Sequence, residues 1–162
     1  MIIGVLYPEK KGGLFMASYP AQYVADYTIS YCTRAKCPIS NLKLQKMLYF
    51  LWVDYYKETK CELYLDDICA WKLGPVVPNV YYNFCSYAGT PIALERPSKI
   101  EETDTGLLDS IIKRYLLMPA STLVNMTHTR GKPWERVYQD GIGNRSVIPF
   151  SLIKDLECSA QC

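Results

Sequence analysis

The stretch NLKLQKMLYFLWVDYYK, residues 41–57, constrains the fold more than any other part of this 162-residue chain. Its apolar side chains recur at i, i+3, i+4, i+7, i+8 and i+11, which is typical of a helix that faces a hydrophobic core. These side chains belong to Leu44, Met47, Leu48, Leu51, Trp52 and Tyr55. Ser40 is a suitable N-cap, and the helix is expected to end near Lys60.

Two further apolar residues of this helix, Phe50 and Val53, fall outside the core-facing stripe. The charged residues on their side are Lys43, Lys46, Asp54 and Lys57. Two explanations remain open. Either the N-terminal helix or the segment around His128 covers this side, or Phe50 and Val53 form the apolar centre of a protein-binding patch with a charged rim.

Hydrophobic spacing along the whole chain predicts a mainly α fold, a compact bundle of about five to seven helices with a minor short β element. A short strand is expected within residues 61–73, and Gly74-Pro75 is expected to end it and open a helix that runs to Gly89. Residues 91–94 could form a second short strand. The other expected helices lie at 19–37, 103–118, 121–128, from 133 onward, and at the end of the chain.

Composition indicates one globular domain. Residues 19–156 are expected to form it, with 1–18 as an N-terminal extension that could lie upstream of a start at Met16, and 157–162 as a tail. The 18 basic and 16 acidic residues are spread along the chain, which disfavours nucleic acid as a partner. No stretch reaches the length of a membrane span, and seven cysteines without metal-site spacing fit reduced thiols in the cytoplasm.

Candidate chemistry is sparse. His128 is the only histidine, so a Cys–His nucleophile pair would need it together with one of the cysteines. A thiol hydrolase of this kind remains an alternative. The favoured interpretation is a hydrogen-bonded packing histidine near the turn at Pro133-Trp134, with no catalytic residues, no metal site and no cofactor.

Three sequence blocks carry a resemblance to a known family. They are NLKLQKMLYFLW from 41, AWKLGPVVPNVY from 70 and STLVNMTHTRGKPW from 121. In this order they resemble the Panacea domain of SocA-like and GepA-like, phage-associated antitoxins, over about residues 19–155. The resemblance implies a non-enzymatic helical domain that neutralises a cognate protein toxin by direct contact. Some relatives are adaptors that deliver a toxin to an ATP-dependent protease, which is a second alternative.

Family positions fall on residues that mostly serve architecture. They are Leu44, Gln45, Lys46, Trp71, Gly74, Pro75, Val77, Tyr81, His128, Pro133 and Trp134. Lys46 is expected to point away from the core stripe and Gln45 to lie at its edge, so both are candidates for contact with a partner. The full set of candidate partner-binding residues is Gln45, Lys46, Phe50, Val53, Lys57, Trp71, Lys72, Pro75, His128 and Trp134.

Overall fold

Helices make up most of the structure, a computed structural model that describes residues 18–159. The α-helices in this range are α1 (Ala21–Arg34), α2 (Asn41–Thr59), α3 (Pro78–Asn83), α4 (Glu102–Leu116), α5 (Ala120–Thr127), α6 (Pro133–Tyr138) and α7 (Phe150–Ile153). Shorter helical turns are η1 (Cys85–Tyr87), η2 (Gln139–Gly141) and η3 (Lys154–Cys158). Strands β1 (Cys69–Trp71) and β2 (Gly74–Val76) form an antiparallel hairpin. The predicted mainly α fold with a minor β element is confirmed.

The expected N-terminal extension and C-terminal tail are described only in small part by the structure. Of the expected N-terminal extension, residues 1–17 lie outside the described residues, and so do residues 160–162 of the expected tail. Glu157 and Cys158, at the start of that tail, belong to η3. None of the described helices combines the length and apolarity needed to cross a membrane.

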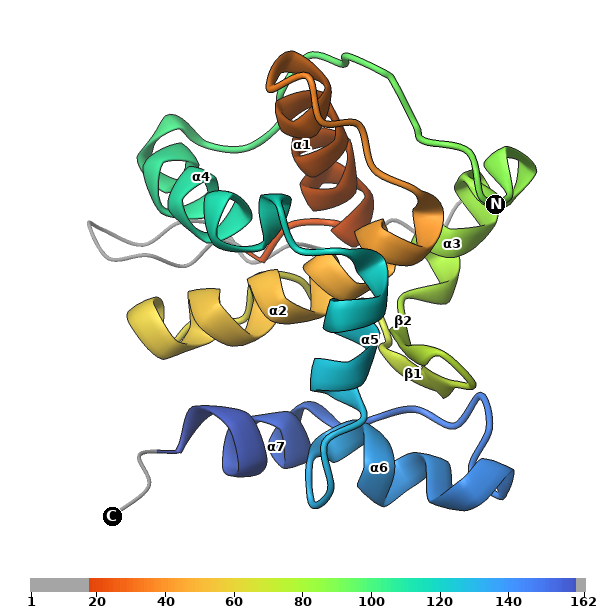
Figure 1. Cartoon of the computed structure of the whole chain (residues 1–162). Coiled ribbons are helices and arrows are strands. Elements are labelled where there is room, and N and C mark those ends of the chain that lie inside the picture. Colours follow the sequence, from red (N-terminus) through yellow and green to blue (C-terminus); the bar gives the residue numbers. More distant parts are fainter. Residues whose placement is uncertain (1–17, 160–162) are drawn as a thin grey trace, which may run out of the picture.

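Helix α2 runs through the middle of the molecule (Figure 1). It contacts α1, α3, α4, α5, β2 and η3, and the six side chains of its expected core stripe are fully buried. Its ends are where the sequence predicts them. The Ser40 side chain accepts a hydrogen bond from the Lys43 backbone N–H at 3.3 Å, and Lys60 ends the helix in the left-handed conformation.

The second side of α2 is covered by α4 and the C-terminal turn η3. The ring of Phe50 stacks on that of Tyr115 in α4, with 5.0 Å between the ring centroids. The carbonyl of Val53 lies 3.8 Å from the Cys158 sulfur in η3. Phe50 is 8% exposed and Val53 is 2% exposed. The alternative of a surface patch centred on these two residues is therefore wrong, because Tyr115 stacks on Phe50 and Val53 is almost completely buried. The contacts seen at this side come from α4 and η3, whereas the sequence had suggested the N-terminal helix or the segment around His128.

The Gly74-Pro75 pair lies in a strand and does not open a helix. Pro75 lies opposite Ala70 in the hairpin, but the backbone groups of Ala70 do not bond to Pro75. The Ala70 N–H donates to the Ser146 carbonyl, and the Ala70 carbonyl accepts from the Arg145 N–H. A proline, which has no N–H, costs no ladder hydrogen bond at such a position. The helix begins at Pro78 instead.

The segment 91–94 was also predicted incorrectly, because it does not form a strand. Its one bridge joins Ile92 to Ile39.

Candidate protein-binding groove

Three segments that are far apart in the sequence come together in the structure. They are the N-terminal half of α2, the β1–β2 hairpin followed by α3, and the connection between α5 and α6. The Lys46 ammonium Nζ donates to the Pro75 carbonyl at 2.6 Å. The Trp134 indole Nε1 donates to the Trp71 carbonyl at 2.8 Å. The three sequence blocks thus form one structural unit.

Side chains of α2 satisfy the outer edge of β2. Pro75 has no N–H, and its carbonyl is taken by Lys46. The next free donor, the backbone N–H of Val77, bonds to Gln45 Oε1 at 2.9 Å, and Gln45 Nε2 donates in turn to Asn41 Oδ1 at 3.0 Å. Unpaired strand edges are sites of unwanted pairing, so these bonds close the edge. Gln45 and Lys46 are buried, and the expectation that Lys46 points outward is wrong.

Lys46 is a buried amine without a counter-ion. It forms no ion pair within residues 18–159, and the Pro75 carbonyl is its hydrogen-bond acceptor there. Burial lowers the pKa of Lys46 to about 7. Transfer of an unpaired ammonium into a protein interior is costly, and the usual response is loss of the proton. A large share of Lys46 side chains is therefore uncharged near neutral pH.

Glycine is required at position 74. Its φ is +105°, and a Cβ there would lie 2.6 Å from Thr127 Oγ1 and 3.0 Å from the Lys46 side chain. The hairpin backbone thus approaches both α5 and α2 more closely than any other residue type allows.

His128 packs against the hairpin unit through Trp134. The two rings are parallel within 5°, with centroids 3.7 Å apart. Its Nε2 is buried and has no hydrogen-bond partner among the described residues. Burial, and then the nearby charge of Lys46, lower the pKa of His128. The expected packing role is confirmed, whereas the expected hydrogen bond is not formed at Nε2.

An open groove lies between α2, the hairpin and α3–η1, with a volume of about 320 Å³. Its lining residues are Asn41, Leu42, Gln45, Lys46, Trp71, Lys72, Leu73, Val76, Tyr81, Cys85 and Ala88. The Trp71 ring lies 4.9 Å from that of Tyr81 and 6.1 Å from that of Tyr82. Leu73 is 51% exposed and Tyr82 is 55% exposed. Large apolar and aromatic side chains around a concave surface are typical of a binding site.

The groove separates the ten candidate residues into three sets. Gln45, Lys46, Trp71 and Lys72 line it. Pro75, His128 and Trp134 are bonded or packed within the same unit. Phe50, Val53 and Lys57 belong to the part of α2 that faces α4 and η3. Sequence analysis missed Tyr82 and Leu73, although the consecutive tyrosines at 81 and 82 signal that one of them must face away from the core.

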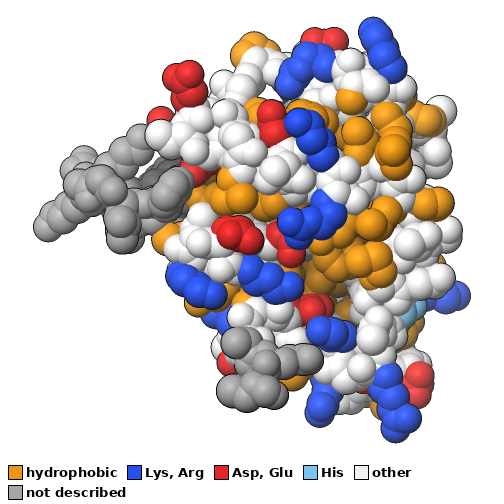
Figure 2. Space-filling model, turned by 60° about the vertical axis from the view of Figure 1, so that its left-hand side comes forward, with side chains coloured by type: hydrophobic (Ala, Val, Ile, Leu, Met, Phe, Trp, Pro, Cys, Tyr) orange, Lys and Arg blue, Asp and Glu red, His pale blue; other side chains and the backbone are white. Residues whose placement is uncertain are grey.

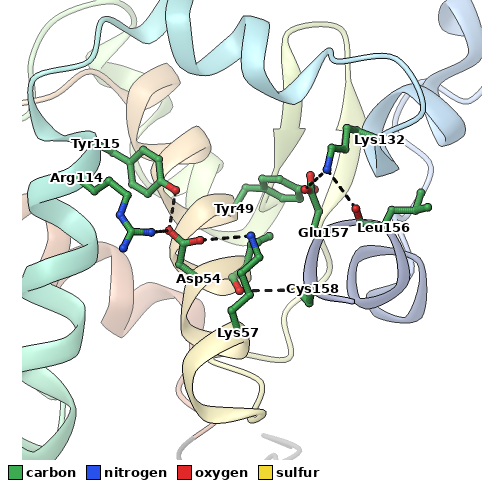
Figure 3. A network of polar contacts seen from close by, with 10 residues as sticks. Tyr49, Asp54, Lys57, Arg114, Tyr115, Lys132, Leu156, Glu157 and Cys158 are labelled. Atoms are coloured by element: carbon green, nitrogen blue, oxygen red, sulfur yellow. Dashed lines mark hydrogen bonds and ion pairs between the residues drawn. The ribbon is translucent and has the colours of Figure 1, made fainter. Parts of the chain in front are cut away.

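Charges on the other side of α2 are paired (Figure 3). Asp54 Oδ2 accepts hydrogen bonds from Arg114 Nη1 and from the Tyr115 hydroxyl, both at 2.7 Å, and Lys57 Nζ lies 3.8 Å from Oδ1. Glu157 of η3 is also paired, because its Oε2 lies 2.9 Å from Lys132 Nζ. Figure 2 shows basic and acidic side chains next to one another across one face of the molecule, beside a band of hydrophobic ones.

Three of the cysteines, Cys32, Cys69 and Cys158, lack the environment of a catalytic thiol. Burial raises the pKa of Cys32 to about 12 and also raises the pKa of Cys69 and Cys158. A reactive cysteine needs the opposite shift, because the thiolate is the nucleophile. The described residues also contain no cluster of His, Cys, Asp or Glu that could hold a metal ion.

Comparison with known proteins places this helical domain and its groove in a family. The family model described as "Antitoxin SocA-like, Panacea domain" matches residues 44–135. The chain is also 34% identical, over 133 residues, to Antitoxin SocA of Caulobacter vibrioides (strain NA1000 / CB15N), with 73% of this chain and 70% of that protein covered. The protein therefore belongs to the SocA-like antitoxin family with a Panacea domain, as its sequence blocks predicted. No solved structure matches it significantly.

Proposed function

We propose that this protein is an antitoxin that neutralises a cognate protein toxin by binding it directly at the groove between α2, the hairpin and α3. Two observations that fall on the same residues support this proposal. The family match spans residues 44–135, and Lys46, Trp71, Lys72, Leu73 and Tyr81, which line the groove, all lie within it. Exposed aromatic and apolar side chains at a concave site are the residue types that dominate protein–protein binding energy.

Neutralisation in this proposal is stoichiometric and needs no catalysis. The curated relative is named for an antitoxin role, which agrees with a binding protein. The adaptor hypothesis adds a requirement for an ATP-dependent protease, and no contact or motif in the described residues favours it. The two hypotheses differ in one measurable respect, which is whether rescue from the toxin depends on a protease.

The first experiment uses the open reading frame next to the gene for this protein. Its product is expressed alone and together with this chain, and growth is recorded in a strain with and without its ATP-dependent proteases. We expect toxicity alone, growth when both are present in either strain, and a complex that co-elutes in size-exclusion chromatography. Continued growth arrest on co-expression, or rescue without any complex, contradicts direct neutralisation. Rescue confined to the protease-proficient strain favours the adaptor.

A second experiment locates the interface. Tyr82→Ala removes an exposed ring that does not line the groove itself but lies beside it, 6.1 Å from the ring of the lining residue Trp71, and Leu117→Ala removes a side chain that is 84% exposed at the end of α4. Neither change should alter the melting temperature, because neither side chain is buried. We expect Tyr82→Ala to weaken toxin binding by at least about tenfold and Leu117→Ala to leave it unchanged. The reverse order of effects would move the interface to the C-terminal end of α4.

A further inference from the structure

The charges around the groove define the chemistry of the segment that it binds. Building on the function proposed above, we infer that the groove recognises an acidic segment of the toxin, one in which an apolar anchor side chain is flanked by carboxylates. The apolar lining takes the anchor, and the cations at the edge take the carboxylates.

Unpaired cations are the first observation. Lys72 lines the groove and is exposed, and the guanidinium of Arg145 lies over the Trp71 ring, 4.8 Å from its centroid. Neither Lys72 nor Arg145 forms an ion pair with a described residue. Other cations on the surface do, and examples are the pairs Arg96–Asp26, Lys132–Glu157 and Lys154–Glu62. Among residues 18–159, no acidic residue lines the groove. The positive charge at this site is therefore available to a partner.

Shape and polarity of the groove select an apolar anchor. A volume of about 320 Å³ is at the small end of ligand sites, so the groove fits one or two side chains and not a large cofactor. Trp71 and Tyr81 provide aromatic surface, and Leu42 and Val76 provide aliphatic surface. Burial of an apolar side chain here would supply most of the affinity, while carboxylates near Lys72 and Arg145 would supply orientation and faster association.

Nucleic acid fits this site less well than an acidic peptide does. Binding to a phosphate backbone needs several cations along an extended surface. The groove has Lys72 in its lining and Arg145 over the ring of Trp71, around an apolar interior, and the whole chain has a formal net charge of +2. Lys46 borders the groove, but its side chain is fully buried and its ammonium donates to the Pro75 carbonyl, so it does not offer a charge to a ligand. An acidic protein segment is thus the partner whose chemistry matches both parts of the site.

The test uses two fluorescein-labelled, capped hexapeptides, Asp-Glu-Trp-Leu-Asp-Glu and its neutral analogue Asn-Gln-Trp-Leu-Asn-Gln, titrated with the full chain by anisotropy. We expect the acidic peptide to bind at least about tenfold more tightly at low salt, with a smaller difference at about 0.3 M salt because exposed charges are then screened. Equal affinities, or no saturable binding of the acidic peptide, overturn the inference. Tighter binding of a duplex DNA probe of equal charge also overturns it.

Matched variants assign the preference to the groove. The double variant Lys72→Glu, Arg145→Glu should lose the preference for the acidic peptide, whereas Lys113→Glu, Arg130→Glu reverses the same number of exposed charges elsewhere and should keep it. Cys85→Trp places a large side chain in the groove and should weaken both peptides, and the neighbouring Ser86→Trp, which does not line the groove, should not. A melting curve for each variant identifies any that fail to fold. Retained preference in the folded Lys72, Arg145 variant overturns the assignment.

Binding of the neighbouring gene product separates this inference from the proposed function. If that product binds the wild-type chain and the Lys72, Arg145 variant equally well, the antitoxin function stands and the acidic-segment inference fails. If it binds neither while the acidic peptide keeps its preference, the chemistry of the groove stands and the proposed partner is wrong.

Discussion

The two halves of α2 bury charged groups in opposite ways. Asp54, in the C-terminal half, accepts hydrogen bonds from Arg114 and Tyr115 and has Lys57 nearby. Lys46, in the N-terminal half, has the Pro75 carbonyl as its acceptor and no carboxylate partner in the part of the chain that the structure describes. A buried charge is stable only when partners replace its lost hydration. The Asp54 site meets this condition with partners, whereas at the Lys46 site burial lowers the pKa to about 7 and so favours the uncharged form.

The elements that surround the two halves of α2 differ as well. Around Asp54 the molecule is closed, because α4 and η3 cover the helix and Arg114 of α4 forms an ion pair with Asp54. Around Lys46 the hairpin closes only the backbone edge, and the groove beside it stays open, with Lys72 and Arg145 forming no ion pair to any described residue. A helix with apolar residues on two sides can therefore have one side that serves the fold and another that borders a binding site.

The largest expected effect concerns the close approach of the hairpin to Lys46. Gly74→Ala should destabilise the protein by about 2–4 kcal/mol, because it combines an unfavourable φ with a clash against Thr127. Gly131 also has a positive φ but has open space around it, so Gly131→Ala should cost only about 1 kcal/mol. Gly89→Ala, which has neither problem, should change stability by less than about 0.5 kcal/mol. Urea unfolding of all three checks this order, and equal costs for the first two would exclude the clash.

The next effect tests the paired half of α2. Asp54→Asn should destabilise the fold by about 1–3 kcal/mol, because Arg114 and the Tyr115 hydroxyl lose a charged acceptor. The half-exposed Arg114 can turn to solvent, which keeps the loss below that of a fully buried pair. Glu58→Gln, an exposed change on the same helix, is the control and should be neutral. Equal stability of the Asp54→Asn and Glu58→Gln proteins would show that the Asp54 contacts contribute nothing.

The unpaired half is tested by the pH dependence of Lys46→Met. The folded pKa of about 7 lies below the unfolded value, so between these values the unfolded state binds more protons and wild-type stability rises with pH. Relative to Lys46→Met, the wild-type protein should gain up to about 1 kcal/mol per pH unit above pH 7 and show a constant difference below it.

Unfolding free energies of the wild-type and Lys46→Met proteins, measured at several pH values, give this difference directly. The subtraction removes the contributions of cysteines and tyrosines that titrate in the same range, and His128 is the other titratable group close to Lys46. A difference that does not change between about pH 7 and pH 10 would mean that Lys46 keeps its proton in the folded state.

The smallest effect sharpens the distinction between the two sides. Lys57 is exposed and lies 3.8 Å from Asp54, so Lys57→Glu should change the free energy of unfolding by less than about 0.5 kcal/mol. Rescue from the toxin should also be unchanged, because we place the interface at the groove. Weaker rescue by a Lys57→Glu protein with a normal melting curve would bring this side of α2 back as a binding surface.

Local features of the chain were predictable where local chemistry decides them. The 41–60 helix follows from its periodicity, its start from the Ser40 hydroxyl, and the short α6 from Pro133 at its first position. The order of three sequence blocks was enough to predict the family, and the match over residues 44–135 confirms it. The packing role of His128 was also predicted, because a lone histidine cannot assemble a site by itself.

Other features depend on partners that the sequence does not reveal. Gly74-Pro75 was read as the start of a helix, yet Ser146 and Arg145 take the ladder bonds of Ala70 and leave a proline acceptable in β2. Burial of Phe50 depends on Tyr115, and the groove depends on how the hairpin sits against α2. Candidate residues on α2 could be proposed from the sequence, but those that reach the groove could not be separated from those that do not.

By itself, the sequence determined that α2 would be a long helix with a buried stripe, because the spacing of side chains along a helix is a local property. The tertiary structure alone decided which of its charged residues would be buried and how each would be stabilised. Asp54 meets Arg114, which is 60 positions away in the chain, and among the described residues Lys46 has a backbone carbonyl of the hairpin as its hydrogen-bond acceptor. The cost of burying a charge depends on the groups that surround it in space, and periodicity along one helix contains no information about those groups.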